Sequence, residues 1–403
     1  MSQTDQSLIQ SQLGRYRWPG LIVAGVGLVI SIGGAFLNLE QFWQSYLLAF
    51  LFWLEIGLGC LAIVMLHHLV GGRWSFLIRR FMEAGASTLP LMALLFIPLL
   101  FGLPSLYRWL DAETVANSDL LQQKSAYLNL PFFIARSVFY FAVWIGLAYL
   151  LQRWSTAQDQ TGNPALAIRL RRLSSIGLIL YILTATFAAY DWMMSLEPEW
   201  FSSIYGLLFI AGQILAALAL AVIGLRYLST REAGRQKIAG ADWANYFNDL
   251  GNFLLGFVMI WAYFSFSQYL IIWSANLPEE AIWYYHRSQG GWQWVGMFLI
   301  AFHFALPFFL LLSRLIKRRA RLLTGLAILI FLIRIVDLYW LVVPALHPDG
   351  IHFHWLAVIL FITLGGAWAA VFFQGLASRP LLSLSDPQMR ELVHDSSEEF
   401  AAP

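Results

Sequence analysis

Cysteine and charge are both scarce in this 403-residue chain, and each scarcity excludes a class of protein. Cys60 is the only cysteine, so the chain has neither a disulfide framework nor a Cys-x-x-Cys motif for zinc, covalent haem or an iron–sulfur cluster. Charged residues make up 12% of the chain against 59% apolar residues, which is too little polar surface to cover a soluble globule of this size. We therefore predict a polytopic membrane protein.

Ten long apolar stretches are each long enough to cross a bilayer. Hydrocarbon offers the backbone no hydrogen-bond partners, so a stretch of about 20 apolar residues crosses it as an α-helix. The predicted spans are residues 18–37, 43–70, 81–103, 126–151, 173–195, 200–227, 247–273, 290–314, 322–345 and 354–375. The predicted fold is therefore all-α and integral to the membrane, with a membrane domain at 18–377, an N-terminal segment at 1–17 and a polar C-terminal tail at 378–403.

Basic residues are distributed unevenly between the two sets of connections. One set, together with both terminal segments, holds 20 of the 25 basic residues, whereas the other holds only Arg108, Lys124 and Arg287. Lys and Arg are retained on the cytoplasmic side of a membrane. We therefore expect both termini in the cytoplasm, which requires an even number of crossings. The segment 1–17 lacks a small-residue cleavage site, so no removable signal peptide is expected.

Aromatic residues gather at the predicted outer ends of the spans. Amphipathic rings anchor helices at the headgroup level of a membrane, so we interpret this group as an interfacial belt. The alternative is that some of the rings pack around a quinone head. The group consists of Trp192, Trp200, Phe201, Trp273, Trp283, Tyr284, Tyr285, Trp292 and Trp294.

A weak internal duplication relates spans 2–5 to spans 6–9. The sequences DWMMSLEP at 191–198 and DLYWLVVP at 337–344 each have a proline seven residues after an aspartate. The third span opens with EAG at 83–85 and the seventh with DLG at 249–251. We expect two four-helix bundles of parallel orientation, flanked by spans 1 and 10.

Several ionisable side chains lie inside the predicted spans. A charge at the bilayer centre costs about 2.5–3.5 kcal/mol on insertion scales, so such residues usually face the protein interior and often mark an ion or substrate path. Glu55 lies near the middle of the second span, where a proton relay and a structural interhelical hydrogen bond are the two interpretations. His303 is also mid-span and is suited to relaying protons, because imidazole titrates near neutral pH.

Two further positions have a structural alternative. Arg334 and Asp337 are three residues apart on one predicted helix, within pairing distance, so mutual neutralisation competes with a functional role. Asp191 lies at the outer end of its span and is followed by Glu197 and Glu199, so we expect it to be interfacial and hydrated.

Cofactor motifs are not evident in the sequence. Haem ligation requires two facing histidines at one depth, and no such pair is apparent. His347, His352 and His354 lie in the last outer loop without a thiolate or a placed carboxylate to complete a metal site, so a solvated loop is expected. Phosphate-loop, dinucleotide and nucleophile-elbow patterns do not occur. A net charge of +2 indicates no nucleic-acid partner.

Three runs of residues resemble one family. YDWMMSLEPEWFSS at 190–203, DLGN at 249–252 and YLIIWSANLP at 269–278 resemble the F subunit of bacterial alternative complex III. That subunit belongs to the NrfD-like family, which includes the polysulfide-reductase membrane anchor. The resemblance covers residues 43–375. It implies a ten-helix subunit with two four-helix bundles in a quinol:electron-acceptor oxidoreductase of the bacterial cytoplasmic (inner) membrane.

The resemblance also implies partners and a ligand. The partners are a paralogous C-type membrane subunit, an iron–sulfur B subunit and c-type cytochrome subunits, through which electrons would leave. The ligand is a quinone or quinol, although the quinol pocket in this family is usually credited to the C-type subunit. Asp191, Asp249 and Asp337 lie in matching motifs, whereas Glu55 and His303, like Arg136, are selected by burial alone.

The leading hypothesis is a quinone-associated or proton-conducting membrane subunit that has no redox centre and is not catalytic alone. The alternatives are a secondary transporter with a midplane ion or substrate site, and a purely structural membrane anchor. The proton-path candidates are Glu55, Asp191, His303, Asp337 and Asp249. The candidates for a structural ion pair or a quinone pocket are Arg334 and Arg136.

Overall fold

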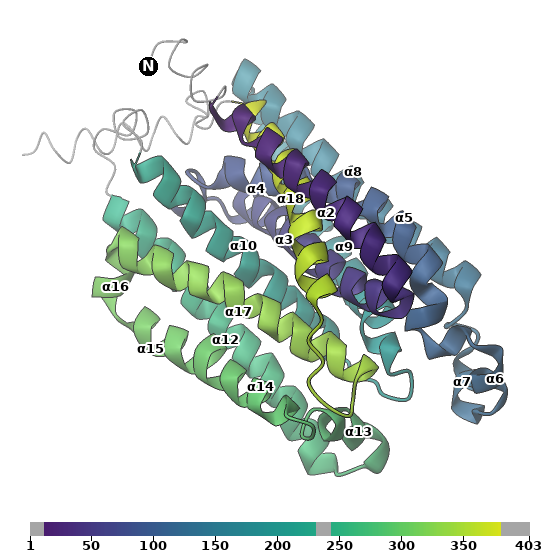
Figure 1. The fold of residues 1–403 in the computed structure, drawn as a ribbon. Coiled ribbons are helices and arrows are strands. Elements are labelled where there is room, and N and C mark those ends of the chain that lie inside the picture. The colour runs from purple at the N-terminus through teal and green to yellow at the C-terminus, as the bar shows by residue number, and fades with distance from the viewer. Residues whose placement is uncertain (1–11, 231–242, 380–403) are drawn as a thin grey trace, which may run out of the picture.

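The computed structural model describes residues 12–230 and 243–379. Within these residues helices are the only regular secondary structure, and ten of them are long and apolar enough to cross a membrane. Figure 1 shows these helices as a bundle of roughly aligned rods. The predicted all-α membrane fold is therefore confirmed. The largest difference in a boundary is at the fourth span, which was expected at 126–151 and is found at Leu130–Thr161.

The spans follow one another along the chain, and the connection between α5 and α8 holds short helices of its own. They are α2 (Arg17–Leu37), α3 (Leu39–Val70), α4 (Arg79–Ala86) with α5 (Leu89–Leu106), α8 (Leu130–Thr161), α9 (Pro164–Trp192), α10 (Tyr205–Thr230), α12 (Trp243–Ala275), α14 (Trp292–Leu299) with η4 (Ile300–Ala305) and α15 (Leu306–Leu312), α17 (Ala320–Leu346) and α18 (Trp355–Ala377). The shorter helices are η1 (Arg73–Ser75), η2 (Arg108–Leu110), α6 (Ala112–Ala116), α7 (Asp119–Lys124), η3 (Met194–Leu196), α13 (Pro278–His286) and α16 (Arg314–Arg318).

Asparagine and glycine set the ends of several helices. Asn38, Asn129 and Asn163 precede α3, α8 and α9, and each accepts a hydrogen bond at 3.0 Å from a backbone N–H of the first turn. Such a cap satisfies one of the donors that a helix start leaves unpaired. Gly162 adopts a left-handed conformation (φ 61°) at the end of α8, which allows an immediate reversal into α9.

The helices α3 and α10 form the centre of the molecule. In their most apolar windows 94% and 83% of the residues are buried, compared with 22% in α2 and in α12. They pack against each other, and each also packs against α9 and α17. Gly59 on α3 lies against the backbone of Gln213 on α10, where a larger side chain would collide. Protein therefore encloses these two helices on nearly all sides.

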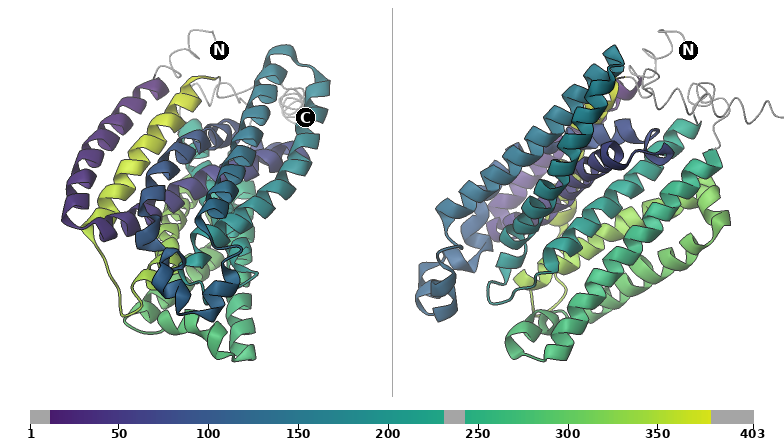
Figure 2. Two further views of the ribbon diagram at one scale, coloured as in Figure 1. Left: turned by 90° about the vertical axis from the view of Figure 1, so that its right-hand side faces the viewer. Right: turned by 180° about the vertical axis from the view of Figure 1, so that it is seen from behind.

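The helices group into the two four-helix bundles expected from the duplication. The first bundle consists of α3, α4–α5, α8 and α9, and the second of α10, α12, α14–α15 and α17. The helices α2 and α18 lie side by side, with their backbones in close approach at Gly20 and Gly366 (Figure 2). Both pack against α3 of the first bundle, so spans 1 and 10 cover one bundle together.

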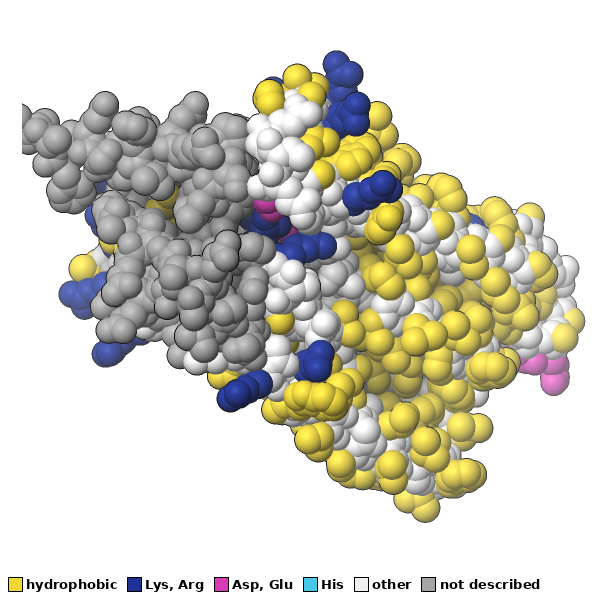
Figure 3. Space-filling view, turned by 90° about the horizontal axis from the view of Figure 1, so that it is seen from above, with side chains coloured by type: hydrophobic (Ala, Val, Ile, Leu, Met, Phe, Trp, Pro, Cys, Tyr) yellow, Lys and Arg dark blue, Asp and Glu magenta, His cyan; other side chains and the backbone are white. Residues whose placement is uncertain are grey.

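The basic connections meet at one end of the molecule, which we call the basic end. Nη1 of Arg17, at the start of α2, donates to Oε1 of Gln374, near the end of α18, at 2.7 Å. Arg80 at the start of α4 pairs there with Asp159 at the end of α8. Figure 3 shows basic side chains gathered toward this end and hydrophobic side chains over the flank. This arrangement is consistent with the pattern from which the cytoplasmic orientation was predicted.

The predicted aromatic belt is wrong for four of its members. Trp192, Trp200, Trp283 and Trp292 are at most 2% exposed. The rings of Trp200 and Trp283 stack with 4.9 Å between centroids, and Nε1 of Trp292 donates to the carbonyl of His347 at 3.0 Å. These rings are packing residues. Exposed rings that remain suited to the headgroup level are those of Phe201, Trp273, Tyr285 and Trp294.

Candidate functional site

Three ionisable residues meet where the two bundles join, and we call them the central cluster. Nη2 of Arg334 on α17 donates to Oε2 of Glu55 on α3 at 2.7 Å. Nη1 of the same guanidinium donates to Oδ2 of Asp337, one turn further along α17. The three residues are at most 1% exposed. The expected pairing of Arg334 with Asp337 is present, and the structure adds Glu55 to it.

The central cluster contains two carboxylates and one guanidinium, so its formal charge is −1 when both acids are ionised. Buried charge is costly unless it is compensated, and a proton on either carboxylate would make the cluster neutral. Oε1 of Glu55 and Nε of Arg334 have no hydrogen-bond partner among the described residues. The arrangement is therefore chemically suited to binding and releasing one proton.

His303 adjoins the central cluster through a tryptophan. Nε1 of Trp261 on α12 donates to Oδ2 of Asp337 at 3.1 Å, and the Trp261 ring lies 4.2 Å from the His303 ring, centroid to centroid. His303 is fully buried, and neither of its ring nitrogens has a hydrogen-bond partner among the described residues. It lies in η4, a π-helical turn inside the eighth span. Such turns are frequent at functional sites.

A glycine on α10 leaves room for the guanidinium of Arg334. A Cβ at Gly212 would collide with the guanidinium of Arg334, so a glycine is required for this approach. The next residue, Gln213, accepts a hydrogen bond from the hydroxyl of Tyr181 on α9 at 2.5 Å. Two polar connections therefore cross between the bundles, one from α3 to α17 and one from α9 to α10. These are equivalent helix pairs under the duplication.

Asp191 forms a separate site near the opposite end of the first bundle. Arg136 on α8 donates to both carboxylate oxygens at 2.8 and 2.9 Å, and the Tyr140 hydroxyl donates to Oδ2 at 2.7 Å. The guanidinium also lies over the Tyr127 ring at 3.8 Å. Asp191 is fully buried, so the expectation of a hydrated interfacial aspartate is wrong. Arg136 is its structural partner.

A second ion pair, which was not predicted from the sequence, lies at the opposite end. Oε2 of Glu197 accepts from Nη1 of Arg287 at 3.0 Å, and its Oε1 lies 2.7 Å from Nδ1 of His286. Arg287 also donates to the carbonyls of Trp340 and Leu341 on α17. Burial works against the charged form of Glu197, but the charge of Arg287 and the two hydrogen bonds bring its pKa below the ordinary value.

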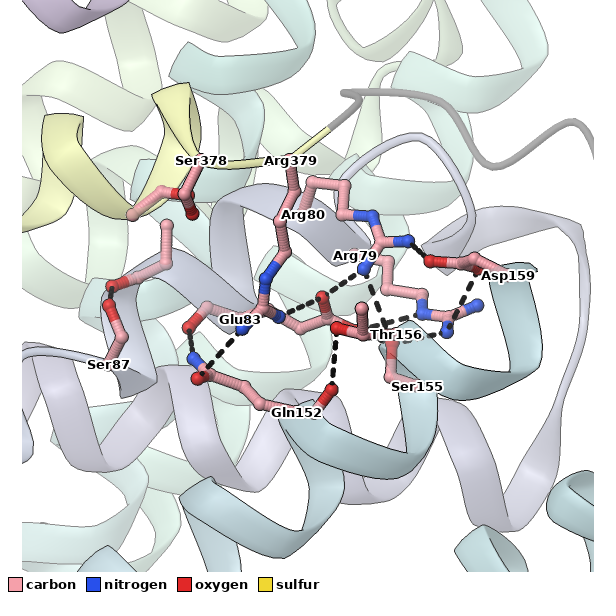
Figure 4. A network of polar contacts seen from close by, with 12 residues as sticks. Arg79, Arg80, Glu83, Ser87, Gln152, Ser155, Thr156, Asp159, Ser378 and Arg379 are labelled. Carbon is pink, nitrogen blue, oxygen red and sulfur yellow. Dashed lines mark hydrogen bonds and ion pairs between the residues drawn. The ribbon is translucent and has the colours of Figure 1, made fainter. Parts of the chain in front are cut away.

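A third polar network lies at the basic end (Figure 4). Glu83 on α4 pairs with Arg80 and accepts from Oγ of Ser155 on α8 at 2.6 Å. Arg80 also pairs with Asp159, and Nη1 of Arg379 lies 3.5 Å from Glu83. In the sequence, Glu83 stands out only in the repeated EAG and DLG triplets, because nothing in a sequence shows that three distant segments meet there.

Asp249 lies apart from the central cluster. It is half-buried in the first turns of α12, twelve residues before Trp261, which corresponds to about 18 Å along the helix. Gly251 nearby packs against Lys317, whose Nζ donates to Oδ1 of Asn252 at 2.6 Å. Of the five proton-path candidates, the structure thus brings Glu55 and Asp337 together and places His303 beside them.

Two of the three histidines of the last outer loop contact α3, whereas His354 accepts from the backbone N–H of Leu356 at the start of α18. Nε2 of His347 lies 2.7 Å from Oε1 of Gln44, and Nε2 of His352 lies 2.8 Å from Oε1 of Gln41. The expected solvated loop is therefore wrong for His347, which is half-buried. Throughout 12–230 and 243–379, no group of three His, Cys, Asp or Glu side chains is arranged to hold a metal ion.

Neither a scan against protein-family models nor a search of curated proteins finds a match to this chain. A functional assignment therefore depends on the chemistry of the buried groups and on the resemblance carried by the sequence runs at 190–203, 249–252 and 269–278. Among the buried groups, the central cluster has the most unusual balance of charge.

Proposed function

We propose that this chain is an integral membrane subunit of a quinol:electron-acceptor oxidoreductase complex, in which it conducts protons and associates with quinone without carrying a redox centre. In this proposal the complex lies in the bacterial cytoplasmic membrane, and both termini of the chain are cytoplasmic. Its partners are a paralogous C-type membrane subunit, an iron–sulfur B subunit and c-type cytochrome subunits. The chain alone is not catalytic.

The observation that carries the proposal is the central cluster of two carboxylates on one guanidinium. Lipid offers a proton no binding groups, whereas buried carboxylates and imidazole provide them along a helix bundle. Glu55 and Asp337 compete for Arg334, and His303 lies one ring beyond Asp337. A simple structural ion pair requires one acid, and the second acid is the feature that supports proton transfer.

Proton transfer through this cluster follows from its charge. Oxidation of quinol in a partner subunit delivers electrons to the iron–sulfur and cytochrome subunits and releases protons. A proton bound at the free Oε1 of Glu55 leaves Arg334 paired with Asp337, and the cluster is then neutral. Release of that proton restores the shared pairing. The free energies of the protonated and the deprotonated cluster both depend on the position of the Arg334 guanidinium. A small movement of α17 against α3 would therefore favour one protonation state over the other.

Glu55→Gln tests the proposal in the purified complex. The amide keeps an oxygen for Arg334 but binds no proton, so we expect assembly to persist while the rate of proton release falls by about 100-fold. The matched control is Glu40→Gln, which removes an exposed carboxylate from the first turn of the same helix. Proton release is measured with a pH-sensitive dye during quinol oxidation, and assembly by the cytochrome content of the purified complex.

Two results would contradict the proposal in different ways. Unchanged proton release in Glu55→Gln would show that Glu55 is a packing residue, even if the complex is the one proposed. Purification of the chain without cytochrome or iron–sulfur partners would remove the complex itself.

A secondary transporter is the second candidate, and one observation favours it. The eighth span is interrupted by the π-helical turn η4, followed by Pro307, beside the central cluster. Interrupted helices near the midplane are typical of ion and substrate sites in transporters. The test is exchange of labelled ions or solutes by the chain alone in liposomes. Exchange that Glu55→Gln abolishes would support this candidate over the complex subunit.

A further inference from the structure

A cleft at the basic end, which we call the basic cleft, opens between the start of the first helix and the end of the last. It has a volume of about 320 Å³, and its lining includes Arg15, Arg17, Trp18, Gln374 and Ser378. Two arginines line it, and none of the described lining residues is a carboxylate. The basic cleft therefore presents positive charge beside the apolar surface of α2.

The two arginines are not neutralised by the part of the chain that the structure describes. Arg17 donates to the neutral side chain of Gln374 at 2.7 Å, and its guanidinium lies 5.1 Å from the Trp18 ring. Arg15 is exposed, and no carboxylate within 12–230 or 243–379 pairs with it. Both guanidinium groups thus keep donors for a further acceptor.

A second cavity adds to the positive charge behind the basic cleft. It has a volume of about 110 Å³, shares Ser378 with the basic cleft, and includes Arg80, Glu83 and Arg379 in its lining. The network there contains three arginines and two carboxylates, and Nε of the buried Arg80 has no hydrogen-bond partner among the described residues (Figure 4). The field of this network therefore favours an anion in the basic cleft.

We propose that the basic cleft binds the phosphate of an anionic phospholipid. Guanidinium groups match phosphate oxygens in geometry and charge, and a tryptophan at the same depth is suited to the headgroup region. In the next turns of α2, Leu21, Ile22 and Val26 expose 48%, 63% and 57% of their surface, which provides an apolar track for acyl chains. Basic pockets between transmembrane helices are typical binding places for such headgroups.

The bound lipid would bridge the start of α2 and the end of α18, because the described lining of the basic cleft comes from these two ends. Free phosphate offers the same oxygens as a lipid headgroup, but it has no acyl chains to contact the apolar track. A lipid therefore accounts for both halves of the site. This inference concerns a different part of the molecule from the central cluster and stands or falls independently of the proposed function.

Lipid binding is measured on the purified protein, together with any subunits that accompany it, in nanodiscs of phosphatidylcholine with or without phosphatidylglycerol. Native mass spectrometry reports retained lipid, and the thermal unfolding midpoint reports stabilisation. We expect phosphatidylglycerol to be retained and to raise the midpoint. Each arginine contributes about fivefold to the affinity, so Arg15→Gln with Arg17→Gln should weaken it by about 25-fold. The corresponding pair of lysine substitutions, which keeps the charge, should preserve most of the affinity.

The matched control is Arg171→Gln with Arg172→Gln. These two arginines are exposed near the start of α9, so the control removes the same charge from another part of the basic face. Equal loss of lipid in both double variants would overturn the proposal and leave only general surface attraction. Displacement of the lipid by millimolar inorganic phosphate would also overturn it in favour of free phosphate. Arg15→Gln alone, at a residue without a described partner, keeps the test decisive if the double variant misfolds.

Discussion

Each four-helix bundle holds one buried aspartate of the repeated motif, but the two aspartates are balanced differently. In the first bundle, Asp191 has one guanidinium to itself, and both of its oxygens accept hydrogen bonds. In the second, Asp337 shares Arg334 with Glu55 from the first bundle. A complete one-to-one pair gains nothing from a proton, whereas a shared arginine leaves a place for one. The two aspartates of the repeated motif therefore differ in how their charge is compensated, and under the proposed function only the site of Asp337 takes up a proton.

The two sites also differ in what they join. The Arg136–Asp191 pair links α8 to α9 and lies within one bundle. The central cluster links α3 to α17, and its tryptophan neighbour comes from α12, so it lies across the contact between the bundles. Any change in its protonation acts on the packing of one bundle against the other. The Arg136–Asp191 pair lies within the first bundle and does not join it to the second.

Removing the arginine from each site should give the largest loss of stability. Arg334→Met leaves two buried carboxylates without a cation, and we expect a loss of about 3–5 kcal/mol in the free energy of unfolding. Arg136→Met leaves one carboxylate, and a loss of similar size is expected. A second substitution separates the sites, because Asp191→Asn should restore most of the stability of Arg136→Met, whereas Asp337→Asn should restore only part of that of Arg334→Met while Glu55 remains.

These four variants are compared by thermal or denaturant unfolding in one detergent. Addition of Glu55→Gln to the Arg334→Met and Asp337→Asn variant serves as the control, since it removes the last charge of the cluster and should recover the remaining stability. If both aspartate-to-asparagine substitutions recovered the same stability, Glu55 would bear no uncompensated charge. The proposed difference between the Asp191 site and the central cluster would then be contradicted.

A methyl group beside Arg334 should have an intermediate effect. Gly212→Ala places a Cβ against the guanidinium, which must move away from Glu55 or Asp337, and we expect a loss of about 1–3 kcal/mol in stability together with slower proton release. Gly146→Ala in α8 serves as the control in the first bundle, because a Cβ there has open space. It should be neutral or slightly stabilising, as alanine is the better helix former. Equal effects of the two substitutions on proton release would argue against a role for the position of Arg334.

The smallest expected effect is on the stability of the protein at acid pH, through a carboxylate outside the spans. The pKa of Glu197 is lowered in the folded protein despite its burial, because Arg287 and His286 stabilise the carboxylate. Its contribution to stability is therefore present above the unfolded pKa and is lost as pH falls through the folded pKa. Glu197→Gln should flatten the dependence of the unfolding midpoint on pH in this acidic range.

Asp111 in the outer loop of the first bundle provides the comparison for Glu197. Its hydrogen bonds with Thr114 lower the pKa of its carboxyl as well, but this side chain is fully exposed. Asp111→Asn should leave the acid-range stability almost unchanged, because water screens an exposed charge. An equal response of the two variants would mean that burial of the Glu197 pair has no consequence for stability.

Much of the fold was predictable because apolar length is directly visible in a sequence. All ten spans, their grouping into two bundles and the burial of Glu55, His303 and Asp337 follow from segment length, the repeated motif and the cost of charge in lipid. The side chains that contact these buried groups were much harder to predict. Tyr140 and Gln213 were missed because α8 and α10 are apolar on most sides and give little periodic signal of which face points inward.

The sequence therefore indicates how deep a residue lies along its span, but not which neighbouring helix its side chain faces. The sequence by itself determined that ten helices within the described residues are long and apolar enough to cross a membrane, and that most basic residues lie on one set of connections, because hydrocarbon tolerates only long apolar helices. Only the tertiary structure decided that Glu55 shares an arginine with Asp337 while Asp191 has one of its own. Rotation of each packed helix about its axis selects these partners, and that rotation depends on all of the neighbouring side chains together.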